Sequence, residues 1–552
     1  RTEPIIFSPT DPHNLYFASN TLWQTRSGGR NWQEISPDLT RKTFEVPASV
    51  GKYRDQPSAQ PRQRGVIYTV APSPIDGNRI WTGTDDGLIH LTTDAGKNWT
   101  DVTPPQIGPW WKVSLMDASH FDSKTAYAAV NTIRLDDLRP HIYRTRDDGK
   151  TWQEITSGIP ADENVNVVRE DTQRRGLLFA GTERGVYLSY DDGDNWQSLR
   201  LNLPATSVRD LIVKDDDLAI ATHGRGFWIL DNITALRQLQ PNEKATLLVK
   251  PQTALRVRWN SNTDTPLPPD EPVGENPPEG ALLDYSLGEK SSGPVTLEIK
   301  DSQGQLVRRY ASNDPVPPED PQLRIPRYWV RPPRILSDEP GWHRFYWDMH
   351  GTPLPETKPE YPMTAIYRET APQPTAPWTL PGNYAVVLTV GGKSFTQPLV
   401  LKMDPRLKVT DAELTKQFEL SKRLQDLRAQ LAPIGKSYDA LVGELGKAKD
   451  RADEKEVQDS IKNLRGKLEE FANPAAVRAG DTLELDVLNK VAKLFHDLQE
   501  VDAGPTAQQE IACGDLQRAA RIVLERWPSL PADVTALNAK LQAAGVEPIK
   551  FP

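Results

Sequence analysis

The sequence has very little cysteine and no long apolar run. Among its 552 residues Cys513 is the only cysteine, which excludes an intrachain disulfide framework and any multi-cysteine zinc or iron–sulfur site. No apolar run approaches the roughly 20 residues that cross a bilayer, so we expect no membrane span. Basic residues are outnumbered, 66 against 75 acidic ones, and the net charge of −9 argues against nucleic acid as the main partner.

The chain also lacks an initial methionine and a recognisable signal peptide. It opens at Arg1 and enters a strand pattern by Ile5. We therefore expect either that a segment was removed upstream or that the chain is a piece of a longer protein.

Four segments share one short pattern, and their spacing indicates a repeat. The pattern is Ser/Thr-x-Asp-x-Gly-x-Asn/Thr-Trp, with a serine replacing the Asp in the first copy. Successive tryptophans lie 67, 53 and 44 residues apart, the scale of a four-stranded propeller blade plus inserts. In such a turn the Asp accepts from backbone amides, the glycine adopts a positive φ, and the tryptophan packs between blades. The structural residues of the pattern are Ser27, Gly29, Trp32, Asp94, Gly96, Trp99, Asp147, Gly149, Trp152, Asp191, Gly193 and Trp196.

Each copy closes a run of short strands, so we predict one blade per copy. A fifth unit without the pattern follows, and ATLLVK at 245–250 is a candidate for its missing fourth strand. The expected blades cover 5–36, 66–103, 113–156, 165–203 and 208–232, with inserted loops at 41–65 and 131–141.

These turns resemble the Asp-boxes of bacterial neuraminidase (BNR) repeats. Residues 1–240 resemble the C-terminal part of the propeller in large bacterial BNR-repeat proteins, often described as sortilin-like or as glycosyl hydrolases. The resemblance rests on FSPTDPHNLYFASNTLWQTRSGGRNWQEISPDLT, GTDDGLIHLTTDAGKNW, GTERGVYLSYDDGDNW and ATHGRGFWILD. It implies further blades upstream, on another segment or chain, and a secreted, periplasmic or cell-surface location.

Two further domains are expected after the blades. Residues 241–405 combine alternating strand patterns with a proline-rich composition, since 23 of the 49 prolines fall between 251 and 380, and predict an immunoglobulin-like β-sandwich. Trp347 is expected in its core, with Asp348 hydrogen-bonded to a turn.

Residues 406–552 change to a helical period and predict an antiparallel helical bundle that begins at the N-cap Thr410. The expected helices cover 411–431, 433–472, 481–501, 507–526 and 532–544, and Cys513 is expected to be buried. The fold class is therefore mainly β with an α-helical C-terminal domain.

Turns between the second and third strands of each blade should gather on one face, opposite the Asp-boxes. They carry Asp85, Asp86 and Glu183 as weak catalytic candidates, and Arg184, His223 and Arg225 as candidate ligand-binding residues. Carboxylates beside arginines suit a glycosidase, which needs one acid and one base or nucleophile. Charged turn residues that are merely solvated, or that bond neighbouring blades, remain the alternative. The eight histidines show no metal-binding spacing, so we expect neither a metal nor another cofactor.

Two functions are compatible with these observations. The first is a non-catalytic extracytoplasmic propeller scaffold that binds a protein, peptide or glycan; it is favoured because catalytic signatures are lacking. The alternative is a glycoside hydrolase of the BNR-repeat type that uses carboxylates on the propeller face. Asp-boxes mark a fold shared by enzymes and binding proteins, and they discriminate little between the two.

Overall fold

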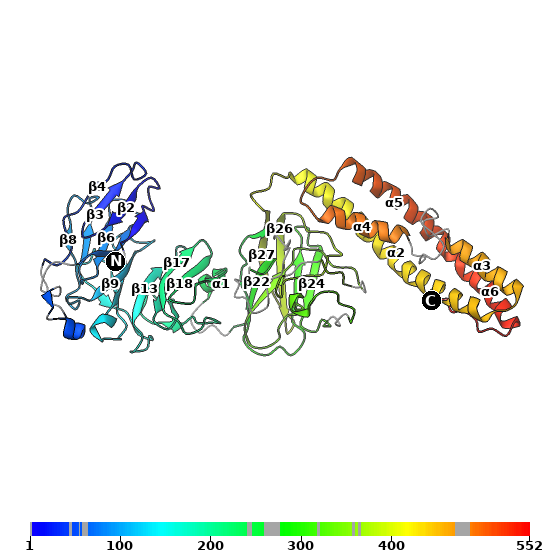
Figure 1. Ribbon diagram of the computed structural model, residues 1–552, viewed down its shortest axis with the longest axis horizontal. Helices are drawn as coiled ribbons and strands as arrows, with labels where there is room; N and C mark the ends of the chain where they lie inside the picture. Colours follow the sequence, from blue (N-terminus) through cyan, green and yellow to red (C-terminus); the bar gives the residue numbers. More distant parts are fainter. Residues whose placement is uncertain are drawn as a thin grey trace. The chain divides into compact units, whose positions relative to one another are not determined.

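A computed structural model describes residues 3–42, 47–54, 56–57, 65–239, 245–258, 277–316, 321–355, 359–362, 366–469 and 486–551. Residues 43–46, 55 and 58–64 of the loop expected at 41–65, and the proline-rich run at 265–276, therefore lie outside the described residues. The chain divides into two compact units, residues 1–243 and 244–552 (Figure 1).

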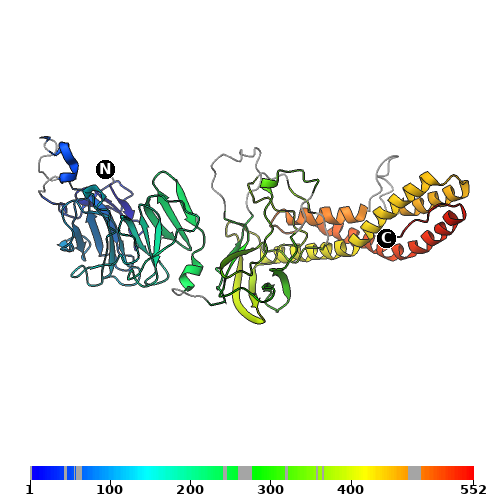
Figure 2. The same cartoon turned by 90° about the horizontal axis from the view of Figure 1, so that it is seen from below.

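The first unit consists of five small antiparallel sheets that follow one another along the chain (Figure 2). Four of them have four strands in sequence order, and the fifth has three. The first two are β1 (Ile5–Phe7), β2 (Leu15–Ala18), β3 (Leu22–Thr25), β4 (Gln33–Glu34), and β5 (Ile67–Pro72), β6 (Ile80–Thr84), β7 (Ile89–Thr92), β8 (Thr100–Asp101). The next three are β9 (Lys112–Ala118), β10 (Ala126–Asn131), β11 (Ile142–Thr145), β12 (Gln153–Glu154), then β13 (Val165–Glu170), β14 (Leu178–Thr182), β15 (Val186–Ser189), β16 (Gln197–Ser198), and β17 (Val208–Lys214), β18 (Asp217–Thr222), β19 (Phe227–Leu230). Short helices η1 (Ala48–Tyr53), η3 (Ile133–Leu135) and α1 (Thr234–Gln238) lie in its connections.

From the second sheet onward, neighbouring sheets pack against each other through their first strands. β5 contacts β9, β9 contacts β13, and β13 contacts β17, which is the arrangement of blades in a propeller. Apolar side chains fill the space between sheets: Trp81, Val113 and Met116 share one core, and Val167, Phe179 and Val208 share another. The prediction of a mainly β protein with small antiparallel sheets is confirmed.

The repeated turns lie between the third and fourth strands and tie each sheet to the one before it. Asp94 accepts the amide of Asn98 at 2.9 Å, and these bonds hold the pKa of its carboxyl below the usual range. In the first copy the Ser27 hydroxyl takes the same part, accepting the amide of Asn31 at 2.9 Å. The indole nitrogens of three repeat tryptophans donate to carbonyls of the preceding sheet: Trp99 to Ile35 at 2.9 Å, Trp152 to Val102 at 2.7 Å and Trp196 to Ile155 at 2.8 Å.

The fifth sheet differs from its prediction. Residues 245–250 do not extend it: β20 (Leu247–Leu248) pairs instead with β22 of the second unit, where Leu248 is 3% exposed. Burial of this leucine in the other core accounts for the difference. Phe227 and Ile229 of β19 remain 85% and 61% exposed. Further blades upstream stay a prediction.

The second unit begins with two sheets that share one core. One contains β20, β22 (Ala281–Leu287) and β25 (Gly341–Trp347). The other has the order β21 (Ala254–Arg256), β27 (Lys393–Met403), β26 (Gly382–Val390), β23 (Thr296–Lys300) and β24 (Leu306–Ala311). Both sheets contribute apolar residues to one cluster, in which Trp347 is fully buried as predicted. The immunoglobulin-like topology stays a prediction. A short helix η4 (Arg327–Trp329) lies in one connection.

Helices form the rest of the second unit, which confirms the predicted change of period. They are α2 (Asp411–Arg451), α3 (Lys455–Glu469), α4 (Asp486–Gln499), α5 (Ala507–Arg526), η5 (Trp527–Ser529) and α6 (Leu530–Ala543). In Figure 1, α4 and α5 lie along one half of α2, and α3 and α6 lie at its other end. Thr410 caps α2 in a capping box with Glu413, as predicted, and Cys513 is buried. The separate domain limits 241–405 and 406–552 remain untested.

The predicted break before Pro433 is wrong, because α2 runs through this proline without interruption. Buried Leu424 and Leu431 precede it, and buried Tyr438 and Leu441 follow it in the same core. Packing along both halves outweighs the cost of one missing backbone hydrogen bond.

No helix in the described part of the chain is long and apolar enough to cross a membrane. Within the same residues, no group of three or more histidine, cysteine or acidic side chains is arranged to hold a metal ion.

Candidate functional site

The turns between second and third strands carry the predicted site residues. Asp85 and Asp86 lie between β6 and β7, Glu183 and Arg184 between β14 and β15, and Arg225 between β18 and β19. The repeated tryptophan turns occupy the opposite ends of the same sheets, because they join third to fourth strands.

Asp86 is a buried structural residue in this arrangement. Its side chain accepts the Thr84 hydroxyl at 2.6 Å and the backbone amide of Arg41 at 3.0 Å, and the residue is 0% exposed. Burial raises the pKa of its carboxyl, against the hydrogen bonds that oppose the shift. Asp86 therefore fixes the segment around Arg41, and its catalytic role stays a prediction.

Asp85 lies beside an arginine and a tryptophan instead. Its Oδ1 accepts the amide of Val66 at 2.9 Å, and its Oδ2 is 3.9 Å from Nη1 of Arg134. The guanidinium of Arg134 lies 5.3 Å from the ring centre of Trp110, a cation–π contact. Asp85, Arg134 and Trp110 thus form one connected group at this end of the sheets.

Trp110 holds a strained backbone conformation. Its φ of +68° is in the left-handed region, which is uncommon for a bulky residue. Its amide donates to the carbonyl of Asp86 at 3.2 Å, which anchors the ring next to Asp85. Strain of this kind is concentrated at binding and catalytic sites.

Glu183 is oriented by two neighbours. Its Oε1 accepts from the side-chain amide of Asn166 at 3.0 Å and is 3.1 Å from Nη1 of Arg209. Lys112 is close enough to interact with the charges of Glu183, Arg209 and Arg134. Burial lowers the pKa of its ammonium, and the two arginines act in the same direction. The Lys112 ammonium lies 4.8 Å from the ring centre of Tyr68.

We refer to these residues as the Trp110 cluster: Tyr68, Asp85, Trp110, Lys112, Arg134, Glu183 and Arg209. It combines two carboxylates, three cations and two aromatic rings. Such a group can hold a polyhydroxylated ligand, since carboxylates accept from hydroxyl groups, cations donate to oxygens, and aromatic faces pack on apolar faces of sugar rings.

The other predicted residues lie outside this cluster. Arg184 pairs with Asp162 at 2.8 Å, and both side chains are more than half exposed. His223 and Arg225 are exposed on the turn of the fifth sheet. The two arginines therefore stay unassigned candidates, and nothing here brings His223 to the carboxylates.

Sequence reasoning missed five members of the cluster: Tyr68, Trp110, Lys112, Arg134 and Arg209. A signal was present in PWWK at 109–112, where two tryptophans and a lysine enter an inner strand. Arg134 lies on the insert at 131–141. This insert joins a second strand to a third, so it is expected at the same end of the sheets as Asp85 and Glu183.

No family model matches the sequence. Two curated proteins align with part of it, both at 25% identity. One is an oligoxyloglucan-reducing end-specific xyloglucanase of Emericella nidulans, matched over 185 residues, and the other a probable enzyme of the same description from Neosartorya fischeri, matched over 178. Each match covers 31% of this chain but only 20% of the relative's length.

Among solved structures, the protein is similar to the GH74 xyloglucanase of Xanthomonas campestris at 16% identity, over 51% of this chain and 42% of that chain, with a TM-score of 0.33. A GH74 enzyme of Niastella koreensis aligns at 13% identity over 42% of this chain and 36% of that one, with a TM-score of 0.31.

Proposed function

We propose that the protein is a secreted glycoside hydrolase that acts on a β-glucan of the xyloglucan type, and that the Trp110 cluster binds the substrate. The observation that carries this proposal is the pair of carboxylates, Asp85 and Glu183, placed among arginines and aromatic rings at one end of the sheets. The two partial relatives are xyloglucanases, which favours the hydrolase over a non-catalytic scaffold.

Glu183 is the candidate base or nucleophile. The guanidinium of Arg209 at 3.1 Å and the amide of Asn166 at 3.0 Å hold its Oε1 in a fixed position. Asp85 is the candidate proton donor. As the acid of the pair it would protonate the leaving-group oxygen of the glycosidic bond.

Hydrolysis assays on the full chain test these roles. With xyloglucan and its oligosaccharides as substrates, we expect Glu183→Gln and Asp85→Asn each to lower kcat by about 100-fold or more. Asp162→Asn is the matched control, because Asp162 is an exposed carboxylate outside the cluster, and its activity should stay within about twofold.

Two results would decide against this proposal. Binding of xyloglucan oligosaccharides without any cleavage would replace the hydrolase by a non-catalytic glycan-binding scaffold. Neither binding nor cleavage of any β-glucan would remove the glycan function altogether. Circular dichroism of each variant checks that the fold is retained.

A further inference from the structure

A large pocket lies in the second unit, whereas the Trp110 cluster belongs to the first. Its volume is about 1000 Å³. Segments around 330–335, 348–354 and 371–376 form half of its wall, and Arg428 of α2 and His496 of α4 also line it. This size is at the upper end of pockets that bind small molecules.

Prolines and aromatic residues give the wall its shape. Pro332, Pro333, Pro372 and Pro374 line the pocket, so part of the unusual proline content of this region is located here. Because proline has a fixed φ, such a wall loses little conformational entropy when a ligand binds.

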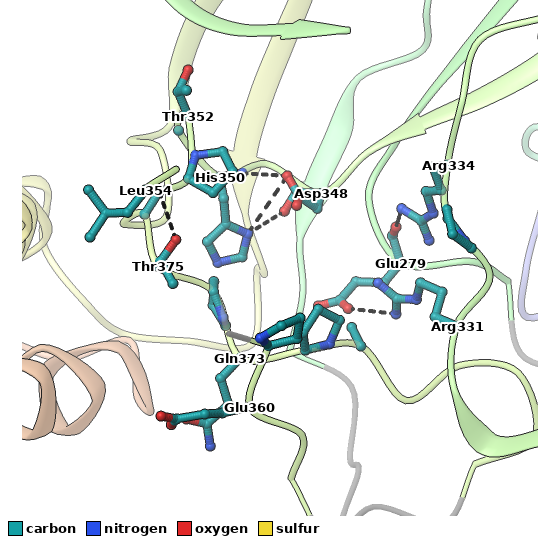
Figure 3. Close-up of a pocket in the computed structure, with 18 of the residues that line it drawn as sticks. Glu279, Arg331, Arg334, Asp348, His350, Thr352, Leu354, Glu360, Gln373 and Thr375 are labelled. Carbon is teal, nitrogen blue, oxygen red and sulfur yellow. Dashed lines mark hydrogen bonds and ion pairs between the residues drawn. The ribbon is translucent and has the colours of Figure 1, made fainter. Parts of the chain in front are cut away.

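Arginine is the commonest charged residue of the wall. Seven arginines and five carboxylates line the pocket, an excess of positive charge in a protein whose net charge is −9. In Figure 3, Arg331 and Arg334 lie on one side, while Asp348 and His350 lie together on the other. Arg331 is already paired with Glu279 at 3.1 Å and Glu369 at 3.0 Å. The arginines that can bind a ligand are therefore other members of the wall.

Several buried donors of the wall have no acceptor. Within the described residues, Nε of Arg258, Nε of Arg308 and Nη1 of Arg428 are buried without a hydrogen-bond partner. A buried unpaired donor costs about 1–3 kcal/mol, and native structures contain few of them. The three arginines that carry them line one cavity, where an anionic group can accept from their guanidinium groups.

His350 offers the opposite function, an unused acceptor. His350 is 7% exposed, and its Nδ1 lies 2.8 Å from the carbonyl oxygen of Asp348. Since a carbonyl can only accept, Nδ1 is the nitrogen that carries the proton. Burial lowers the pKa of His350, which keeps the ring neutral and leaves a lone pair on Nε2. That atom is buried and, among the residues the structure describes, has no partner.

We propose that this pocket binds a sugar acid, a monosaccharide that carries one carboxylate. The carboxylate accepts from Arg308 and Arg428, and a ring hydroxyl donates to Nε2 of His350. Asp348 and Glu360 also line the pocket, accept further hydroxyl groups, and oppose the entry of a multiply charged anion. The ligand is thereby restricted to a singly charged polyol.

Binding would also reinforce the contact between the sandwich and the helices. The amide of Trp378 donates to Gln499 of α4 at 2.9 Å, and Gln425 of α2 donates to the carbonyl of Thr352 at 3.0 Å. Thr352, Trp378 and Gln499 line the pocket, so a ligand that engages Arg428 and His350 together crosses the same boundary. Ligand binding to the folded state should raise the melting temperature of this unit.

Calorimetric titration of the full chain with glucuronate and galacturonate tests the proposal. We expect at least one of them to bind with a Kd below about 1 mM, and glucose to show no binding at the same concentrations. Arg428→Gln and Arg308→Gln should each weaken binding about tenfold. Arg423→Gln is the matched control, because Arg423 lies on the same helix but is about half exposed and pairs with Glu419.

The possible outcomes separate the explanations. Failure of both uronates to bind at about ten times that concentration would overturn the proposal. Inorganic phosphate binding as tightly as the uronate would replace the sugar acid by a general anion. Glu183→Gln should leave uronate binding unchanged, so the pocket and the proposed hydrolase can fail independently. Circular dichroism of both arginine variants shows whether lost binding reflects lost folding.

Discussion

The repeated turns make a stability prediction that one pair of substitutions tests. Gly149 and Gly29 occupy the same position of the pattern, with φ values of +77° and +84°. A Cβ at Gly149 would meet Val102 of the preceding sheet at 2.6 Å, whereas one at Gly29 meets only Trp32 at 3.9 Å. The strained φ costs about 1–2 kcal/mol at both sites, and overpacking adds about 1–3 kcal/mol at Gly149 alone. We therefore expect Gly29→Ala to lose about 1–2 kcal/mol of stability and Gly149→Ala about 2–5 kcal/mol.

Hydrogen exchange in increasing urea measures both losses without assuming that the whole chain unfolds at once. Peptides from β11 of the third sheet and β3 of the first report on the two sites. Equal losses for the two variants would refute the claim that the turns interlock neighbouring sheets, because only Gly149 faces such a neighbour.

Three further changes have outcomes that follow from single contacts. Trp152→Phe removes the 2.7 Å hydrogen bond to Val102 and should cost about 1 kcal/mol in the same exchange experiment, with no change in the second unit. Asp502→Asn leaves Arg256 and Arg258 without their shared carboxylate and should cost about 3 kcal/mol by urea unfolding. Burial acts to raise the pKa of Asp502, but the two arginines hold it below the usual value, so its stabilisation is complete above about pH 4 and is lost as the pH falls through the lower folded pKa. Acid unfolding should therefore be steeper in the wild type than in Asp502→Asn; identical curves would contradict the assignment. Trp110→Ala should weaken binding of a xyloglucan oligosaccharide about 2- to 10-fold by calorimetry, while Trp32→Ala, in a turn at the other end of the sheets, should not.

Repeats made the first unit predictable to a large extent. The pattern from Thr25 to Trp32 recurs in register, and each copy marks the boundary between third and fourth strands, so the order of small sheets follows from the sequence. The predictions failed where packing between segments that are distant in the sequence determines the structure. Leu247–Leu248 joined the second unit, and α2 continued through Pro433, because buried neighbours elsewhere outweigh local preference.

The candidate sites, too, were predictable from the sequence only in part. Sequence placed Asp85 and Glu183 on equivalent turns but could not tell that Asp86 points into the interior while Asp85 contacts Arg134. Adjacent residues in a turn differ in burial according to what covers them, which here is the segment at Arg41. The pocket in the second unit could not be foreseen at all. Its donors, Arg308 and Arg428, are 120 residues apart and meet only through the contact of sandwich and helices.

A crystal structure of the full chain with a xyloglucan oligosaccharide tests the central claim most directly. We predict a sugar ring packed on Trp110, with its glycosidic oxygen within hydrogen-bond distance of Asp85 and its anomeric carbon facing Glu183. An oligosaccharide bound anywhere else on the protein, with the Trp110 cluster unoccupied, would contradict the assignment of this cluster as the substrate site.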